Sequence, residues 1–258
     1  MTQAATQRSA VEDFEQRGAR AALLASQSET AREPLEFAAA LCQAQARAAS
    51  RLQSAALKGK FSDDVDLLLP VVTPLIEIIA RHSEEGEQRV TDDPATARTR
   101  LGVYWSGDSK DYISRALLQP YAAVLRARNL MPDRPHSPGH CPFCGGAAWV
   151  SARKGAPDSE AGFRYLHCAL CGLEWSFIRI RCPSCGEDDP YKLPNFQSDV
   201  HANVRIEACE TCRRYVKSID LTLDARPIPA IDDLLSLSMD LWAAGEGFSR
   251  IEPGLAGL

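Results

Sequence analysis

Eight of the nine cysteines in this chain form four Cys-x-x-Cys pairs between residues 141 and 212. Two cysteines three positions apart can close a tight turn around one metal ion, because both sulfur atoms then reach it at about 2.3 Å. Sets of four thiolates are typical of tetrahedral zinc and iron sites. We therefore expect two metal ions, iron or zinc, with eight ligands between them. The ligands are Cys141, Cys144, Cys168, Cys171, Cys182, Cys185, Cys209 and Cys212.

The four pairs belong to an internal repeat with an offset of 41 residues. The segment Cys-Pro-Phe-Cys-Gly at 141–145 returns as Cys-Pro-Ser-Cys-Gly at 182–186, and a second pair begins 27 residues after the first in each copy. This duplication favours one ion in each copy, while a cross-braced arrangement remains as an alternative. Both arrangements use four protein ligands, which is typical of a structural site rather than a hydrolytic one.

Glycine follows the second cysteine of three pairs, at Gly145, Gly172 and Gly186. Because glycine has no Cβ atom, it permits the positive φ that closes such a turn. Arg213 stands at the fourth position, and there we expect a looser or more basic turn. β-Like runs around each second pair predict hairpins that carry this pair to the first, as in rubredoxins and zinc ribbons. A unit of about forty residues has a small core, so the metal should supply much of its folding free energy.

Two other uses of the cysteines are less favoured. The first twenty residues contain no basic segment followed by an apolar one, and no run of about 18 apolar residues occurs, so we expect a cytoplasmic protein that is not inserted in a membrane. A reducing compartment disfavours disulfides. Thioredoxin-like dithiols use a single Cys-x-x-Cys pair beside a βαβ pattern, not four pairs in a repeat.

The remaining chemistry-bearing residues have ordinary explanations. Cys42 lies on the apolar side of an alanine-rich segment and is expected to be a buried thiol. His167 precedes Cys168 and is either a rival ligand or a hydrogen-bond donor near the site. Base stacking is possible for three aromatic residues, but packing beneath the ribbons explains them more simply: Trp149, Trp175 and Tyr215. We find no phosphate-binding glycine loop and no nucleophile–base set, so we predict no catalytic residue and no enzyme.

Length, composition and charge fit a soluble globular protein of one or two domains. The chain has 258 residues, of which 45% are hydrophobic and 24% charged, and its formal net charge is −5. This acidic balance argues against a strong electrostatic hold on nucleic acid, and we predict no nucleic-acid partner.

Residues 1–135 have the composition and periodicity of helices. The run from Pro34 to Leu57 is rich in alanine, leucine, glutamine and arginine, which all favour helix. Two prolines in the next apolar segment predict a short turn followed by a helix from Pro74. Asp92 and Asp93 resemble a helix start, with Pro94 at the first helical position. A further helix is expected from 111 to 128, kinked or broken at Pro120.

The composition then changes at a proline-rich linker, residues 131–138. We predict an α+β fold: an N-terminal all-helical domain, two tandem rubredoxin-like or zinc-ribbon-like four-cysteine modules, and a C-terminal helix from Ile231 to Ala244. The predicted division is a helical domain at 1–135, a first ribbon at 139–181, a second ribbon at 182–225 and the C-terminal helix and tail at 226–258.

Several runs around the third and fourth cysteines resemble a known family. The run Glu-Ala-Gly-Phe-Arg-Tyr-Leu-His-Cys-Ala-Leu-Cys at 160–171, followed by Glu174-Trp175 and Ile178-Arg179, is similar to the FdhE family of formate dehydrogenase accessory proteins. The order of the four pairs and the closing segment from Pro229 to Arg250 fit this family too. The specific resemblance covers roughly residues 139–250, and the helical half fits in character and length.

The resemblance implies a cytoplasmic maturation factor. Members of the family bind the catalytic subunit of a respiratory formate dehydrogenase before twin-arginine export, and they are needed for its activation without being part of the finished enzyme. The resemblance also implies rubredoxin-type iron, or zinc, on the eight cysteines. Arg164 and Arg205 occupy matching positions in the two copies, and the surface near them is a candidate for contact with the partner. The oligomeric state does not follow from the sequence.

Two alternative functions come from other classes. An iron ion held by four thiolates can cycle by one electron, so the protein is alternatively a rubredoxin-like electron carrier that acts on the same client. The other alternative is a nucleic-acid-binding zinc-ribbon protein, which the charge balance disfavours.

Overall fold

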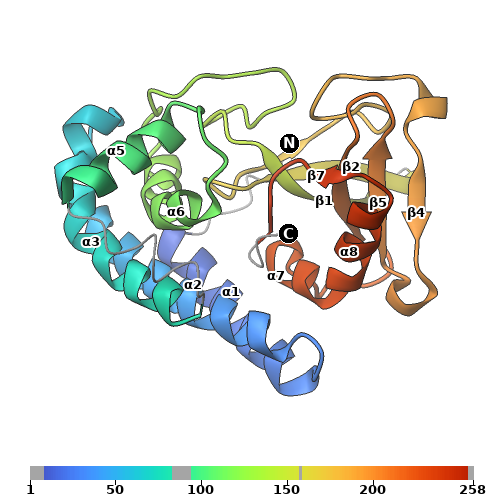
Figure 1. Ribbon diagram of the computed structural model, residues 1–258, viewed down its shortest axis with the longest axis horizontal. Helices are drawn as coiled ribbons and strands as arrows, with labels where there is room; N and C mark the ends of the chain where they lie inside the picture. Colours follow the sequence, from blue (N-terminus) through green and yellow to red (C-terminus); the bar gives the residue numbers. More distant parts are fainter. Residues whose placement is uncertain (1–8, 83–93, 157–158, 255–258) are drawn as a thin grey trace.

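The computed structural model describes residues 9–82, 94–156 and 159–254 of the chain. A helical bundle forms one side of the molecule and a twisted β-sheet forms the other, with the C-terminal helices against the sheet (Figure 1). None of the helices in the described part is long and apolar enough to cross a membrane. The bundle consists of α1 (Ala10–Gln27), α2 (Arg32–Gln53), α3 (Phe61–Arg81), α5 (Pro94–Trp105) and α6 (Tyr112–Ala127).

Helix α6 is the centre of the bundle, because every residue from Ile113 to Leu125 is buried. The Asp111 carboxylate caps its first turn by accepting hydrogen bonds from the backbone N–H groups of Ile113 and Ser114. Small residues dominate the adjoining face of α2, where six alanines are buried. Alanine side chains permit close helix approach and have the best helix propensity. The predicted helix at 34–57 therefore corresponds to α2, and α6 continues through Pro120 without a break.

The prediction for the segment that contains Pro70 and Pro74 was wrong, because α3 is one continuous helix from Phe61 to Arg81. Each proline removes a backbone donor and one helical hydrogen bond. The two prolines lie four residues apart, however, and both are exposed, so the carbonyl groups that they leave unpaired lie on the solvent side of the helix. The opposite face keeps its packing, with Leu68, Leu75 and Ile79 all buried.

The predicted start of the fourth helix is only partly described. Asp92 and Asp93 lie outside the described residues, and α5 begins at Pro94. At the other end of the bundle, α1 begins with a capping box, in which the Ser9 side chain accepts from the Glu12 backbone N–H and the Glu12 carboxylate accepts from the Ser9 backbone N–H.

A single sheet contains the strands of both repeat copies. Its order is β3-β2-β1-β6-β5-β4, and β7 also pairs with β6. Strands β1 and β6 pair in parallel and join the two copies, whereas the pairs within each copy are antiparallel. The strands are β1 (Ala148–Ala156), β2 (Ser159–Cys168), β3 (Glu174–Ser176), β4 (Asn195–Gln197), β5 (Val204–Cys209), β6 (Arg214–Asp220) and β7 (Ser249–Arg250).

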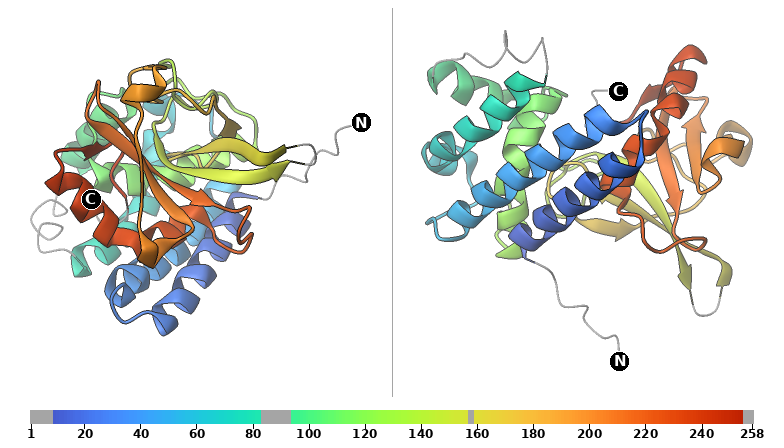
Figure 2. Two further views of the ribbon diagram at one scale, coloured as in Figure 1. Left: turned by 90° about the vertical axis from the view of Figure 1, so that its right-hand side faces the viewer. Right: turned by 90° about the horizontal axis from the view of Figure 1, so that it is seen from below.

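The sequence repeat is also a structural repeat. In the first copy, β2 ends at Cys168 and β3 begins at Glu174; in the second copy, β5 ends at Cys209 and β6 begins at Arg214. Both hairpins therefore have a Cys-x-x-Cys pair at the turn, as the β-like runs predict. Figure 2 shows the two copies side by side in the sheet.

The C-terminal segment differs from the single helix predicted for 231–244. It forms α7 (Pro229–Asp232), a 3₁₀ turn (Asp233–Ser236) and α8 (Leu237–Gly245). The buried Lys217 ammonium of β6 donates to the backbone carbonyls of Asp233 and Ser236, at 2.8 and 3.3 Å. These carbonyls are thus engaged outside the helical ladder, which explains the 3₁₀ turn. The helical region, the sheet and the C-terminal helix together confirm the predicted α+β fold class.

Candidate metal centres

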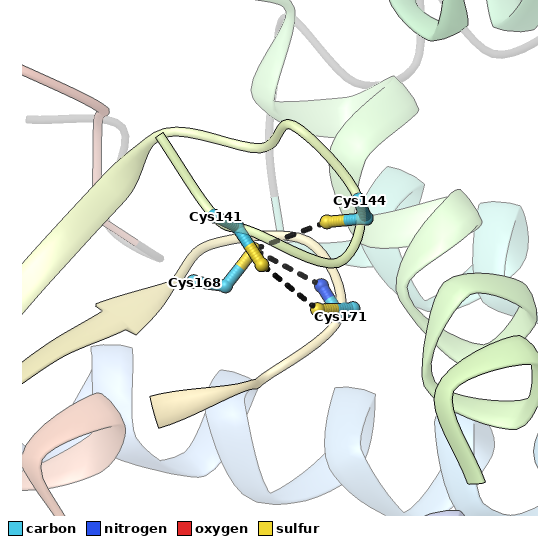
Figure 3. A group of neighbouring side chains, drawn as sticks. All are labelled: Cys141, Cys144, Cys168 and Cys171. Atoms are coloured by element: carbon cyan, nitrogen blue, oxygen red, sulfur yellow. Dashed lines mark hydrogen bonds between the residues drawn. The ribbon is translucent and has the colours of Figure 1, made fainter. Parts of the chain in front are cut away.

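The first cysteine group consists of Cys141, Cys144, Cys168 and Cys171, and all four side chains are buried. The loop before β1 supplies the first pair and the β2–β3 turn supplies the second, so the four sulfurs converge from two segments (Figure 3). The Sγ atoms of Cys141 and Cys171 are 3.6 Å apart, and those of Cys144 and Cys168 are 3.4 Å apart. A tetrahedral ion with bonds of about 2.3 Å needs sulfur–sulfur distances of about 3.8 Å.

The second group consists of Cys182, Cys185, Cys209 and Cys212, and it repeats this geometry. The Sγ distances are 3.7 Å between Cys182 and Cys212, and 3.6 Å between Cys185 and Cys209. In both groups every Sγ atom lies within 4.8 Å of the other three. The cysteines are thus grouped by repeat copy, not cross-braced, and each group can hold one metal ion.

The four turns have one backbone conformation. Gly145, Gly172 and Gly186 have φ values of 66°, 71° and 82°, as their positions after a second cysteine predict. A Cβ atom at Gly145 would lie only 2.0 Å from the Pro135 carbonyl oxygen, so this turn requires glycine for space as well. Arg213 adopts φ 55°, so the fourth turn has the same left-handed conformation at this position despite its side chain, which makes it more basic than the others.

The surroundings of the first group fit a cation. Burial raises the pKa of the Cys168 and Cys171 thiols, whereas hydrogen bonds with Cys144 and the other two thiols lower the pKa of Cys141. Four thiolates at these distances repel each other, so a metal ion is the group that can keep all four deprotonated. The backbone N–H groups of Leu170 and Cys171 point at the Cys168 sulfur, at 3.3 and 3.4 Å, and offset part of the negative charge.

The helical bundle holds the first group directly. Gln119 of α6 donates to the backbone carbonyl of Ala169, inside the second Cys-x-x-Cys pair, at 2.7 Å. Gln45 of α2 donates in turn to the Gln119 amide oxygen at 2.7 Å, and both glutamines are buried. Gly146 packs so closely that a Cβ atom there would lie 2.8 Å from the Cys168 sulfur. The first group therefore lies where bundle and sheet meet.

The second group lies at the surface of the molecule. Cys182 and Cys209 are buried, but Cys185 is exposed and Cys212 is half-buried. The backbone N–H of Ser184 approaches the Cys182 sulfur at 3.4 Å, as in the first group. The two groups thus share the arrangement of their sulfurs and differ in how far solvent reaches them.

The other residues singled out in the sequence mostly have structural roles. The His167 Nε2 atom lies 3.0 Å from the Glu174 carboxylate, so this histidine pairs across the hairpin and is not among the grouped ligand atoms. Burial alone would raise the pKa of Glu174, but hydrogen bonds from His167 and Lys154 lower it to about 2. Cys42 is buried, and this burial raises the pKa of its thiol to about 11. Trp149 and Tyr215 are buried and Trp175 packs against the core.

Two residues near the first group were not found from the sequence. Gln119 and Gln45 lie 74 positions apart and meet only through the packing of α2 against α6. A glutamine in an alanine- and leucine-rich helix is a weak signal, because exposed glutamines are common in helices. Arg164 is also more buried than a partner-contact residue should be, since its side chain is 4% exposed and pairs with Glu207.

Comparison with known proteins gives a consistent match over the cysteine-containing part of the chain. The model of the FdhE central domain matches residues 140–179, and the model of the FdhE C-terminal domain matches residues 180–255. Both cysteine groups lie within these matched segments.

Curated relatives match the same part of the chain. A protein of Aquifex aeolicus (strain VF5) named Protein FdhE homolog is 36% identical over 118 residues, which are 46% of this chain and 41% of that protein. A protein of the same name from Shewanella sp. (strain MR-4) is 41% identical over 155 residues, 59% of this chain and 46% of that protein. The chain thus spans less than half of the length of these relatives.

A solved structure matches the fold of the whole chain. The crystal structure of the FdhE protein from Pseudomonas aeruginosa has a TM-score of 0.69 and 23% sequence identity to this chain. The match covers 95% of both chains. The helical bundle, which gave no specific motif in the sequence, therefore has the same overall fold in that protein.

Proposed function

Because this chain belongs to the FdhE family, we propose that it is an accessory protein for the maturation of a respiratory formate dehydrogenase. In this proposal it binds the catalytic subunit of that enzyme in the cytoplasm, before twin-arginine export, and is needed for its activation. The observation that carries the proposal is the folding of eight cysteines into two four-sulfur groups within the segments that match the two FdhE domains.

We propose that all eight cysteines are metal ligands and that each group binds one ion, iron or zinc. The protein acts by binding and not by catalysis. Four sulfurs fill a tetrahedral coordination shell and leave no open position for a hydrolytic water. The proposed units remain a helical domain at 1–135, ribbons at 139–181 and 182–225, and a C-terminal helix and tail at 226–258.

The two groups have different roles in this proposal. The buried first group fastens the ribbon to the helical bundle through Gln119, and so makes bundle and sheet a single rigid binding body. The second group supports the outer ribbon, whose neighbourhood exposes large apolar side chains. Tyr191 is 95% exposed, Val200 83% and Leu241 61%. Exposed apolar groups of this kind are suited to a protein partner.

The test is anaerobic affinity purification of the tagged chain from its native host, followed by mass spectrometry of the proteins that co-elute. The informative variant replaces Cys185 and Cys212 with serine, because these two ligands are the accessible ones and their loss leaves the buried group intact. Cys42→Ser is the matched control, since it removes a thiol outside both groups.

We expect a formate dehydrogenase catalytic subunit to co-elute with the wild type and with Cys42→Ser, and its yield to fall at least about tenfold with the double variant. Recovery of the subunit at an unchanged level from the double variant would separate the second group from partner binding. Absence of the subunit from every sample, with ribosomal or transcription proteins in its place, would instead support the nucleic-acid-binding alternative.

The exposure of Cys185 favours one second candidate, a one-electron carrier that acts on the same client. Electron transfer needs a short path from the ion to the surface, and the second group has one while the first does not. The measurement is a redox titration of the purified protein followed by electron paramagnetic resonance. A reversible couple that disappears in Cys185→Ser supports this candidate, and a protein that contains only zinc excludes it.

A further inference from the structure

A cavity of about 290 Å³ lies between the two repeat copies and is lined by residues of both. Two of its lining residues, Cys182 and Cys209, belong to the second cysteine group. Its other walls come from β1, β2, β5 and the start of β6, together with the segment that links the two copies. Six of the lining residues are arginines: Arg153, Arg164, Arg179, Arg181, Arg205 and Arg214.

Three carboxylates pair with four of these six guanidinium groups. Asp220 accepts from Arg153 and Arg205, at 3.2 and 3.5 Å. Glu207, which also lines the cavity, pairs with Arg164 at 2.6 Å, and Asp188 pairs with Arg181 at 3.1 Å. The cavity thus keeps an excess of three positive charges. Within the described part of the chain, neither Arg179 nor Arg214 pairs with a carboxylate.

The second cysteine group offsets part of this excess. Four thiolates around a divalent ion retain two negative charges. Among the described residues, however, no arginine of the cavity donates a hydrogen bond to a cysteine sulfur. Arg164 also donates to the backbone carbonyls of Ile178 and Arg181, at 3.1 and 2.9 Å. Among the described residues, the guanidinium groups available to a ligand are therefore mainly those of Arg179 and Arg214.

Several of these donors lack a partner. In the described residues, the Nε–H groups of Arg153, Arg164 and Arg181 are buried without a hydrogen-bond acceptor. A buried donor without an acceptor costs free energy, of order 1–3 kcal/mol for a neutral group and more for a charged one. Arg153 and Arg164 also stand directly opposite each other on β1 and β2, and like charges in such a cross-strand pair are destabilising. A bound anion would accept hydrogen bonds from these donors and would offset the repulsion between the two arginines. The arrangement therefore points to an anion in the cavity.

We propose that this cavity binds a small phosphate-bearing ligand, either a free phosphate or diphosphate or the diphosphate part of an organic ester. Guanidinium groups match the oxygens of phosphate in a bidentate geometry. The volume is close to the lower end for small-molecule sites, at about 300 Å³, which suits a diphosphate and is too small for a folded partner. The apolar lining residues Ile180, Leu193 and Ile251 can contact an organic part. This site goes beyond the proposed function and does not rest on it.

The test is isothermal titration calorimetry of the full, metal-loaded chain in chloride buffer, with phosphate, pyrophosphate and ADP as probes. The variants are Arg179→Gln and Arg214→Gln, because neither side chain forms an ion pair with a carboxylate among the described residues. Arg51→Gln is the matched control, because it removes the same charge from an exposed position on α2. Circular dichroism and metal content confirm that each variant is folded and loaded.

We expect saturable pyrophosphate binding that weakens at least about tenfold in each cavity variant and less than about twofold in the control. Tighter binding of ADP than of pyrophosphate identifies an organic ester as the ligand, and equal or weaker binding of ADP identifies the free anion. The proposal is overturned if no probe binds saturably at millimolar concentration, or if the control loses as much affinity as the cavity variants. Binding of an acidic peptide in place of all three probes would also overturn it.

Discussion

The two cysteine groups have the same sequence pattern, the same turn conformation and similar sulfur distances, yet they lie in opposite environments. All four sulfurs of the first group are buried, and α6 holds its second pair through Gln119. In the second group Cys185 is exposed and Cys212 is half-buried. The arrangement of the sulfurs is therefore set by the local turns, whereas solvent access is set by the residues that pack around each group.

Because one group is buried and the other is partly exposed, we expect metal loss to have different consequences at the two groups. The first group connects elements that are far apart in the sequence, so its loss should loosen the contact between bundle and sheet. The second group joins two segments of its own ribbon, and the pairing of β1 with β6 does not involve its sulfurs. We therefore expect this pairing to remain when the second group opens. Stability is then expected to depend mainly on the first group, and reactivity mainly on the second.

The largest expected effect comes from removing one ligand at equivalent positions of the two copies, Cys144→Ser and Cys185→Ser. Metal binding to a structural site of this kind contributes about 10–16 kcal/mol to folding. We expect Cys144→Ser to lower the free energy of unfolding of the whole chain by several kcal/mol, because the site is buried at the meeting of bundle and sheet. Cys185→Ser should lose one ion while the helices melt near the wild-type temperature.

The measurement combines thermal melts of the helical circular dichroism signal with metal analysis per chain. Cys42→Ser serves as a control for loss of a buried thiol that belongs to neither group. Equal destabilisation by Cys144→Ser and Cys185→Ser would contradict the comparison, since it would mean that burial of the site has no effect on its contribution.

A second prediction concerns reactivity. When a thiol reagent is added to the native, metal-loaded protein, Cys185 and Cys212 of the second group should react about a hundredfold faster than the cysteines of the first. Local opening of a packed region costs a few kcal/mol, and about 3 kcal/mol corresponds to a hundredfold. The exposed Cys185 sulfur needs no such opening.

Mass spectrometry of peptides sampled over time gives the rate at each cysteine, and a chromophoric chelator reports the released ion. In denatured protein all nine cysteines should react at similar rates, which provides the reference. If all cysteines of the native protein react with the reagent at one common rate, the prediction is wrong.

The sequence predicted the parts of the site that depend on local chemistry. Spacing and duplication were enough to group Cys141 with Cys171 and Cys182 with Cys212, and glycine after a second cysteine correctly predicted positive φ at Gly145. Burial could not be predicted, because the two copies are locally alike. Part of the difference arises from α6, whose Gln119 side chain bonds to the Ala169 carbonyl of the first copy, 50 positions away.

The errors in the fold have the same physical origin. Pro70 and Pro74 locally favour a break, but packing along the opposite face of α3 outweighs the lost hydrogen bonds. The segment at 231–244 has a helical pattern, but the buried Lys217 draws two of its carbonyls into other bonds. In both cases a tertiary contact outweighed local propensity.

The smallest expected effect tests whether the turns after the cysteines have the same backbone cost in both copies. A residue with a Cβ atom in the left-handed region loses about 1–2 kcal/mol relative to glycine. Arg213 already has this left-handed conformation, at φ 55°. Its guanidinium carbon lies 3.8 Å from the centre of the Phe248 ring, and its guanidinium group donates to the Glu246 carbonyl. Arg213→Ala and Arg213→Gly both remove these contacts and differ only in the Cβ atom. We therefore expect Arg213→Gly to be about 1 kcal/mol more stable than Arg213→Ala.

The matched change in the first copy is Gly172→Ala, at φ 71°. Its Cβ atom would approach only the end of the flexible Arg17 side chain, so the cost should again be about 1 kcal/mol and arise from the backbone. Denaturant unfolding of the metal-loaded proteins measures all three variants. If Gly172→Ala costs much more than the Ala–Gly difference at Arg213, the turns of the two copies do not share one backbone cost, and the burial of the first group restricts its turn as well as its sulfurs.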